Sequence, residues 1–80
     1  MMEKRSLSLQ GHRTSIALEP PFWRVLEAAA AMRGLSVPKL VSEIDEARVV
    51  APGSAGLASA LRVFALDAVA KNPTLVTNPA

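Results

Sequence analysis

A short strand followed directly by two helices is the feature that most constrains this chain. Residues 13–41 read RTSIALEPPFWRVLEAAAAMRGLSVPKLV, and their polar and apolar residues alternate up to Leu18 before a helical pattern begins. Proline lacks a backbone N–H and restricts φ, so Pro20 and Pro21 should end the strand and start the helix. A lone strand has two unpaired edges, and we therefore expect it to pair with the same strand of a second copy.

Helical spacing of apolar residues predicts two helices after this strand. The first should cover residues 20–33 and the second residues 36–48. Gly34 stands where a left-handed residue commonly ends a helix. Ser36 follows at the position of an N-cap, where its hydroxyl can accept from a free N–H of the next turn.

The rest of the chain predicts a loop, a third helix and a tail. Residues 49–56 contain Ala-Pro-Gly-Ser and should form the loop. Residues 57–71 have a helical pattern that is apolar on most sides, which indicates burial from more than one direction. Residues 72–80 have no clear pattern and should be frayed.

Composition indicates one small domain that gains from association. Half of the 80 residues are hydrophobic, and the mean hydropathy is +0.26. A chain of this size buries a limited share of its surface, and the absence of cysteine excludes disulfides and thiolate metal sites. Dimerisation is the simplest way to bury the surplus. The sequence has no signal-peptide pattern and no long apolar run, so we expect a cytoplasmic protein that does not enter a membrane.

The N-terminal arm, residues 1–12, leaves two arrangements open. Residues 5–9 alternate like a strand, and Gln10-Gly11 can form a two-residue turn. A hairpin would place Leu7 and Leu9 on the same face as Ile16, whereas a continuous strand from residue 5 to residue 18 would place them on the opposite face. We favour the hairpin, because it directs both leucines to the core.

Residues that commonly carry catalysis are sparse. His12 is the only histidine and stands beside a turn glycine, so neither a zinc site nor a Ser-His-Asp triad is indicated. The glycines form no phosphate loop, and Glu43, Asp45 and Glu46 suit a solvated helix face. We predict no catalytic residue, no metal site and no cofactor.

The order of strand, proline entry, helix, Gly34-Leu35-Ser36-Val37 turn and helix resembles the ribbon-helix-helix family, of which Arc and MetJ are members. The resemblance covers about thirty residues and predicts a ribbon-helix-helix core at residues 13–48. It implies a mostly α protein with one short strand per chain, and an intertwined homodimer whose intermolecular antiparallel ribbon enters the major groove of DNA. The third helix would be an addition to this fold.

Aligning the turn with that of the family gives candidate DNA contacts. Arg13, Ser15 and Ala17 take the three outward positions that face base edges, and arginine pairs well with guanine. Ala17 offers only a methyl group. The candidates for phosphate contacts are the basic residues of the arm and the start of the second helix: Lys4, Arg5, Ser36, Val37 and Lys39.

The same resemblance predicts a dimer core from the inward positions of the strand and the apolar stripes of both helices. Its members are Ile16, Leu18, Phe22, Leu26, Leu40, Val41 and Ile44. The leading hypothesis is thus a small homodimeric transcriptional regulator that binds double-stranded DNA.

The alternative is a dimeric protein-interaction module with the same fold and no sequence-specific DNA binding. The third helix could supply a partner surface or extend the core. Its apolar residues are Leu57, Leu61, Val63, Phe64 and Leu66.

Overall fold

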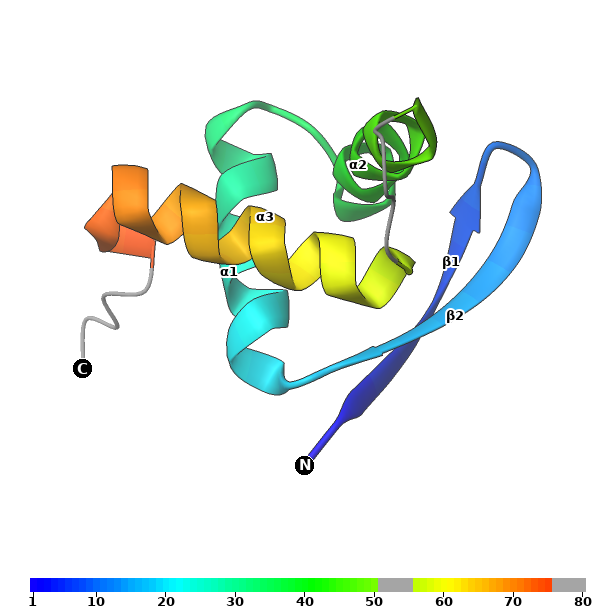
Figure 1. Ribbon diagram of the computed structural model, residues 1–80, viewed down its shortest axis with the longest axis horizontal. Coiled ribbons are helices and arrows are strands. Elements are labelled where there is room, and N and C mark those ends of the chain that lie inside the picture. The colour runs from blue at the N-terminus through cyan, green and yellow to red at the C-terminus, as the bar shows by residue number, and fades with distance from the viewer. Residues whose placement is uncertain (51–55, 76–80) are drawn as a thin grey trace.

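The chain forms a two-stranded hairpin packed on three helices (Figure 1). The computed structural model describes residues 1–50 and 56–75. Figure 1 shows the hairpin along one side of the helices, with α3 crossing in front of α1. The elements in chain order are β1 (Glu3–Leu9), β2 (His12–Leu18), α1 (Pro20–Met32), α2 (Val37–Val50), α3 (Leu57–Lys71) and the 3₁₀ turn η1 (Pro73–Leu75).

The strand that was expected to be alone has a partner in its own chain. β1 pairs antiparallel with β2, with Leu9 opposite His12 and Leu7 opposite Thr14. The hairpin alternative is therefore confirmed, and the prediction of one strand per chain is wrong. Gln10 and Gly11 connect the strands with φ values of 51° and 84°, as a type I′ turn requires.

Local sequence explains the helix ends. Pro20 begins α1 directly after Glu19, whose carbonyl accepts from Phe22 N–H at 2.9 Å. At the other end Gly34 has a φ of 69°, and Leu35 N–H donates to Ala30 O at 2.9 Å. This is the Schellman arrangement that glycine permits.

The second helix is capped as predicted but continues further. Lys39 N–H donates to Ser36 Oγ at 3.2 Å, which is an N-cap bond. Val49 and Val50 are helical rather than part of a loop. Pro73–Leu75 forms a 3₁₀ turn in place of a frayed start to the tail. The remaining predictions for the loop and the tail, at residues 51–55 and 76–80, lie outside the described residues.

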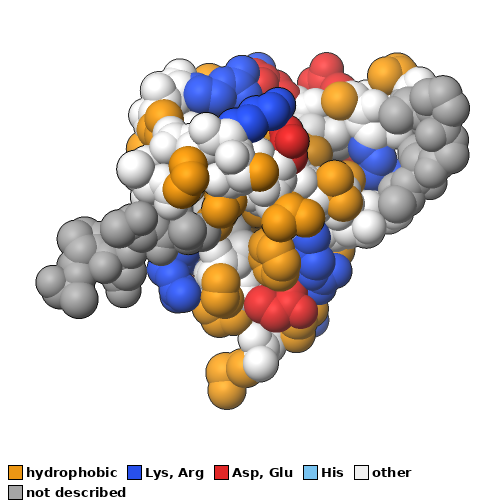
Figure 2. All heavy atoms as spheres, turned by 60° about the vertical axis from the view of Figure 1, so that its left-hand side comes forward, with side chains coloured by type: hydrophobic (Ala, Val, Ile, Leu, Met, Phe, Trp, Pro, Cys, Tyr) orange, Lys and Arg blue, Asp and Glu red, His pale blue; other side chains and the backbone are white. Residues whose placement is uncertain are grey.

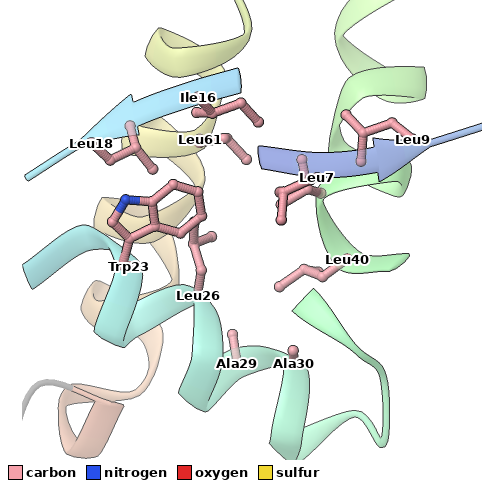
Figure 3. Packing of buried hydrophobic residues seen from close by; sticks show 11 residues of the cluster. Leu7, Leu9, Ile16, Leu18, Trp23, Leu26, Ala29, Ala30, Leu40 and Leu61 are labelled. Atoms are coloured by element: carbon pink, nitrogen blue, oxygen red, sulfur yellow. The ribbon is translucent and has the colours of Figure 1, made fainter. Parts of the chain in front are cut away.

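The hydrophobic core lies between the hairpin and the helices, within one chain. Figure 3 shows Leu18 of β2 above Trp23 of α1, and Ile16 of β2 beside Leu61 of α3. Leu7 and Leu9 of β1 belong to the same buried cluster. The largest fully buried side chains among the described residues are Leu18, Trp23, Leu26, Leu40, Val41 and Leu61.

The residues predicted for a dimer core take part in this single-chain core. Five of them are buried, and Phe22 and Ile44 are partly buried and pack against the cluster. Trp23 was not predicted, although it has no exposed surface. Figure 3 shows its ring beneath Leu18, and its Nε1–H donates to Glu3 O at 2.8 Å.

Candidate nucleic-acid interface

The outward face of the hairpin brings together side chains from both strands. Residues opposite each other in an antiparallel pair lie on the same face, and the register pairs Lys4 with Ala17, Ser6 with Ser15 and Ser8 with Arg13. Because the leucines of both strands face the helices, these three pairs face away from them. Ala17 is partly buried, and the other five residues are exposed.

This face is basic and rich in small polar groups. Lys4 and Arg13 are its cations, and none of its six residues carries a carboxylate. The serine hydroxyls can both donate and accept hydrogen bonds. A two-stranded β-ribbon with these properties can enter a major groove and contact base edges and phosphates.

The sequence analysis did not predict two residues of the outward face of the hairpin. Ser6 and Ser8 were not among the candidates, because the resemblance assigns outward positions to one strand of each chain. The alternation of residues 5–9, read together with a Gln10-Gly11 turn, places Ser6 and Ser8 opposite Ser15 and Arg13 and could have identified them.

Arg5 lies on the inward face, away from the other candidates. Its guanidinium stands 4.6 Å from the centre of the Trp23 ring and forms ion pairs with Glu3 at 2.6 Å and with Glu27 at 2.8 Å. Burial disfavours its charge, but the hydrogen bonds to Glu3 and Glu27 prevail and raise the pKa of Arg5. The structure therefore uses Arg5 to join β1 to α1.

The tip of the hairpin is attached to α2. Gln10 Nε2 donates to Glu46 Oε1 at 3.0 Å and to Ser42 Oγ at 3.4 Å. These bonds hold a glutamine at positive φ, which residues other than glycine, asparagine and aspartate rarely adopt. The hairpin is thus fixed at its tip as well as at Glu3, near its open end.

The start of α2 does not share the outward face. Val37 and Lys39 belong to α2, which Ser36 precedes, and Leu40 and Val41 of this helix pack in the core on the inward side of the sheet. The hydroxyl of Ser36 already caps the helix. Lys39 is exposed there and Val37 is partly buried, so the structure separates these phosphate-contact candidates from Lys4 and Arg13.

The third helix contributes to the core and also to an apolar groove. Leu61 has no exposed surface, and Leu57 and Phe64 pack against the core, so three of the five candidate partner residues serve the fold. Val63 and Leu66 are 64% and 70% exposed. Figure 2 brings the left-hand side of Figure 1 forward and shows hydrophobic side chains exposed among charged ones. A groove of about 180 Å³ between α1 and α3 is lined by Pro21, Phe22, Val25, Ala65, Leu66 and Val69.

Across residues 1–50 and 56–75 the structure shows no cluster of three or more metal-binding side chains. No helix in that part of the chain is long and apolar enough to cross a membrane.

The combination of a β-hairpin, a capped pair of helices and a basic outward face defines the class of small ribbon-containing domains. The family model described as "Ribbon-helix-helix domain" matches residues 2–69. The chain therefore belongs to the ribbon-helix-helix family, as its resemblance to that family indicated.

A solved structure is similar over nearly the whole chain. It is that of an uncharacterized protein from Bordetella pertussis Tohama I, with 36% sequence identity and a TM-score of 0.72. The similarity covers 99% of this chain and 68% of that one. No curated protein matches the chain at a significant level.

Proposed function

We propose that the protein is a homodimeric DNA-binding regulator that inserts a two-stranded ribbon into the major groove. The observation that carries the proposal is the outward face of the hairpin, where Lys4 and Arg13 flank small side chains and no carboxylate intervenes. Membership of a family whose members are typically DNA-binding regulators supports it.

Arg13 is the main base-contacting residue in this proposal. It is exposed, and arginine can bind guanine O6 and N7 with both ends of its guanidinium. Ser15 adds a hydroxyl, while Ala17 can only contact a thymine methyl group. Lys4 supplies a phosphate contact on the same face, with Lys39, Ser36 and Val37 as phosphate-contact candidates at the start of α2. Arg5 is left out, because its charge is neutralised on the inward face.

The test is a titration of labelled random-sequence duplex at low and moderate salt, followed by selection of preferred sequences. Binding should weaken steeply as salt rises, because phosphate contacts release counterions. Arg13→Ala should lose about tenfold or more in affinity for a selected sequence, because a bidentate arginine–guanine pair contributes about 1–3 kcal/mol.

The matched control is Arg24→Ala, which removes the same charge from an exposed position of α1. It should leave the preference for the selected sequence intact. If Arg13→Ala and Arg24→Ala behave alike, the assignment of the ribbon as the reading element is wrong.

The second candidate is a dimeric protein-interaction module with the same fold. The apolar groove between α1 and α3 favours it, because this groove exposes Leu66 beside Phe22 and Val69 without a partner in the described part of the chain. Absence of any duplex binding at low salt would select this candidate over the first.

A further inference from the structure

β1 carries a second row of outward side chains beside those of β2. Ser6 lies directly opposite Ser15, and Ser8 lies opposite Arg13. Lys4 continues the row toward the open end of the hairpin, and all three β1 residues are exposed. We call Lys4, Ser6 and Ser8 the flanking row. The proposed function gives a role to Lys4 and none to the two serines.

The edge of β2 that points away from β1 can pair with a second copy. Leu9 and His12 exchange hydrogen bonds beside the turn, and such pairs alternate with non-hydrogen-bonded ones. Arg13, Ser15 and Ala17 therefore direct their N–H and C=O groups to the free edge of β2. A second copy that pairs there gives the strand order β1–β2–β2–β1. The two β2 strands then form the ribbon of two chains, and one β1 lies on each side of it.

β1 is held in this flanking position before any DNA is bound. Its Leu7 and Leu9 are buried in the core, and the carbonyl of Glu3 accepts from Trp23 Nε1–H at 2.8 Å. Contacts made by a row that is already in place require little ordering of the chain when DNA binds.

The width of the four-stranded sheet places β1 over the walls of the major groove. At the usual strand spacing the two central strand axes lie about 5 Å apart, and the two outer axes lie about 14 Å apart. The major groove is about 12 Å wide. The β2 strands therefore fit between its walls, whereas each β1 lies above the phosphates that border it.

The side chains of β1 and β2 suit these two positions. Ser6 and Ser8 are short, so the sheet can approach until their hydroxyls are within hydrogen-bond reach of phosphate oxygens. Arg13, next to Ser8, is long enough to extend further into the groove. The flanking row contains no carboxylate that would repel phosphate.

We infer that Ser6 and Ser8 are positioning residues that bind the DNA backbone on both sides of the ribbon, with their hydroxyls donating to phosphate oxygens. The inference rests on the proposed function, because it requires the ribbon of two chains to lie in a major groove. Each serine occurs twice in the dimer, so four such contacts flank the two ribbon strands. They fix the depth and orientation of the ribbon and carry no base preference.

The double variant Ser6→Ala/Ser8→Ala tests these contacts. It should weaken binding to random duplex and to the duplex selected by the wild type by the same factor, about tenfold or more, because four hydrogen bonds are lost per dimer. The ratio of the two affinities should stay within about twofold of that of the wild type. Ser59→Ala removes an exposed hydroxyl from α3 and should change neither affinity.

Restoring the hydroxyls separates phosphate binding from a general effect on the strand. Ser6→Thr/Ser8→Thr keeps both hydroxyls and suits a strand, so it should bind both duplexes within about threefold of the wild type. Ser6→Leu/Ser8→Leu also suits an exposed strand face but places bulk against the phosphates, and it should bind at least as weakly as the alanine variant. Urea midpoints check that each variant is folded. A threonine variant that binds no better than the alanine variant would refute the inference.

The outcomes also separate this inference from the proposed function. If the alanine variant binds both duplexes as tightly as the wild type, the serines do not contact phosphate and the inference is refuted. If it loses affinity for the selected duplex alone, the serines read bases and the positioning role is refuted. In either case a loss of preference in Arg13→Ala still supports DNA binding through the ribbon. A wild type that binds no duplex at low salt refutes the proposed function and the inference together.

Discussion

Arg5 and Lys4 show how strongly a one-residue difference decides the role of a basic side chain. Both were predicted to contact phosphate from the charge of the N-terminal arm. In a strand, neighbouring side chains face opposite sides. Lys4 pairs with Ala17 and faces outward, whereas Arg5 pairs with Ile16 and faces inward. Charge alone could not separate them, whereas the strand register could have.

Gln10 has a strained backbone conformation and also makes a tertiary contact. Its φ of 51° is unfavourable for a side chain with a Cβ, and its amide is bonded to Glu46 and Ser42 on α2. Gln10→Ala and Gln10→Gly both remove these bonds, but only alanine keeps the strain. We expect Gln10→Ala to be less stable than Gln10→Gly by about 1 kcal/mol.

Urea denaturation of both variants measures this difference. Ser6→Ala, on the same hairpin but away from the turn, controls for effects on the strand. Equal free energies of unfolding for Gln10→Ala and Gln10→Gly would mean that the turn is not strained.

At the scale of elements, sequence predicted the helices and favoured the hairpin, although the family resemblance implied one strand per chain; the mutual packing of the elements required the structure. Proline entry, Gly34 and Ser36 are local signals, and the structure uses each of them as predicted. Trp23 was not predicted as a core residue because the helical spacing selected Phe22. The sheet packed on α1 explains why the Trp23 ring, and not the Phe22 ring, is fully buried. The all-round apolar pattern of the third helix predicted burial from more than one direction. α3 packs on α1, α2 and β2, but Val63 and Leu66 are 64% and 70% exposed.

The contact between α3 and the start of α1 should contribute a pH dependence. A hydrogen bond from its own backbone N–H and the ion pair with Arg62 at 3.0 Å lower the pKa of Glu19 below its ordinary value of 4.5. A carboxylate with a lowered folded-state pKa stabilises the fold above the unfolded-state pKa. This stabilisation is lost as the pH falls through the folded-state pKa.

Arg62→Met removes the charge and keeps an apolar side chain of similar length. The pKa of Glu19 should move back toward its ordinary value, so the variant should lose less stability than the wild type between about pH 5 and pH 3. Urea midpoints at pH 3, 5 and 7 measure the effect, and Arg24→Met is the control. Parallel pH profiles of Arg62→Met and the wild type would contradict the role of this ion pair.

At the scale of the whole molecule, we expected that two copies would be needed to build one core. β1 and α3 instead contribute to the core within a single chain. β1 pairs with the strand that seemed to need a partner, and Leu61 of α3 lies in the same cluster as Leu18 and Leu26. Composition shows that apolar surface must be buried, but it cannot show whether another segment or another copy buries it.

The proposed dimer can also use an apolar surface outside the hairpin. The groove between α1 and α3, with Leu66 70% exposed at its side, is one such surface for a second copy. Leu66→Glu would place a charge in that contact, and we expect the dimerisation constant to weaken by more than about tenfold. Sedimentation equilibrium over a range of concentrations measures it.

Val49→Glu alters an equally exposed valine on α2, away from the groove, and should leave association unchanged. A wild-type protein that stays a compact monomer at micromolar concentration would refute the dimer itself. Unchanged association of Leu66→Glu would refute only this surface.

The pairing of two different strands in one hairpin has a consequence for how such a protein evolves. Where a ribbon is made by identical strands from two copies, each substitution appears twice, and the preferred site tends to be a palindrome. Here Lys4, Ser6 and Ser8 can change independently of Arg13, Ser15 and Ala17. Substitutions on β1 are therefore uncoupled from those on β2, and the outward face of one hairpin has no internal symmetry to preserve.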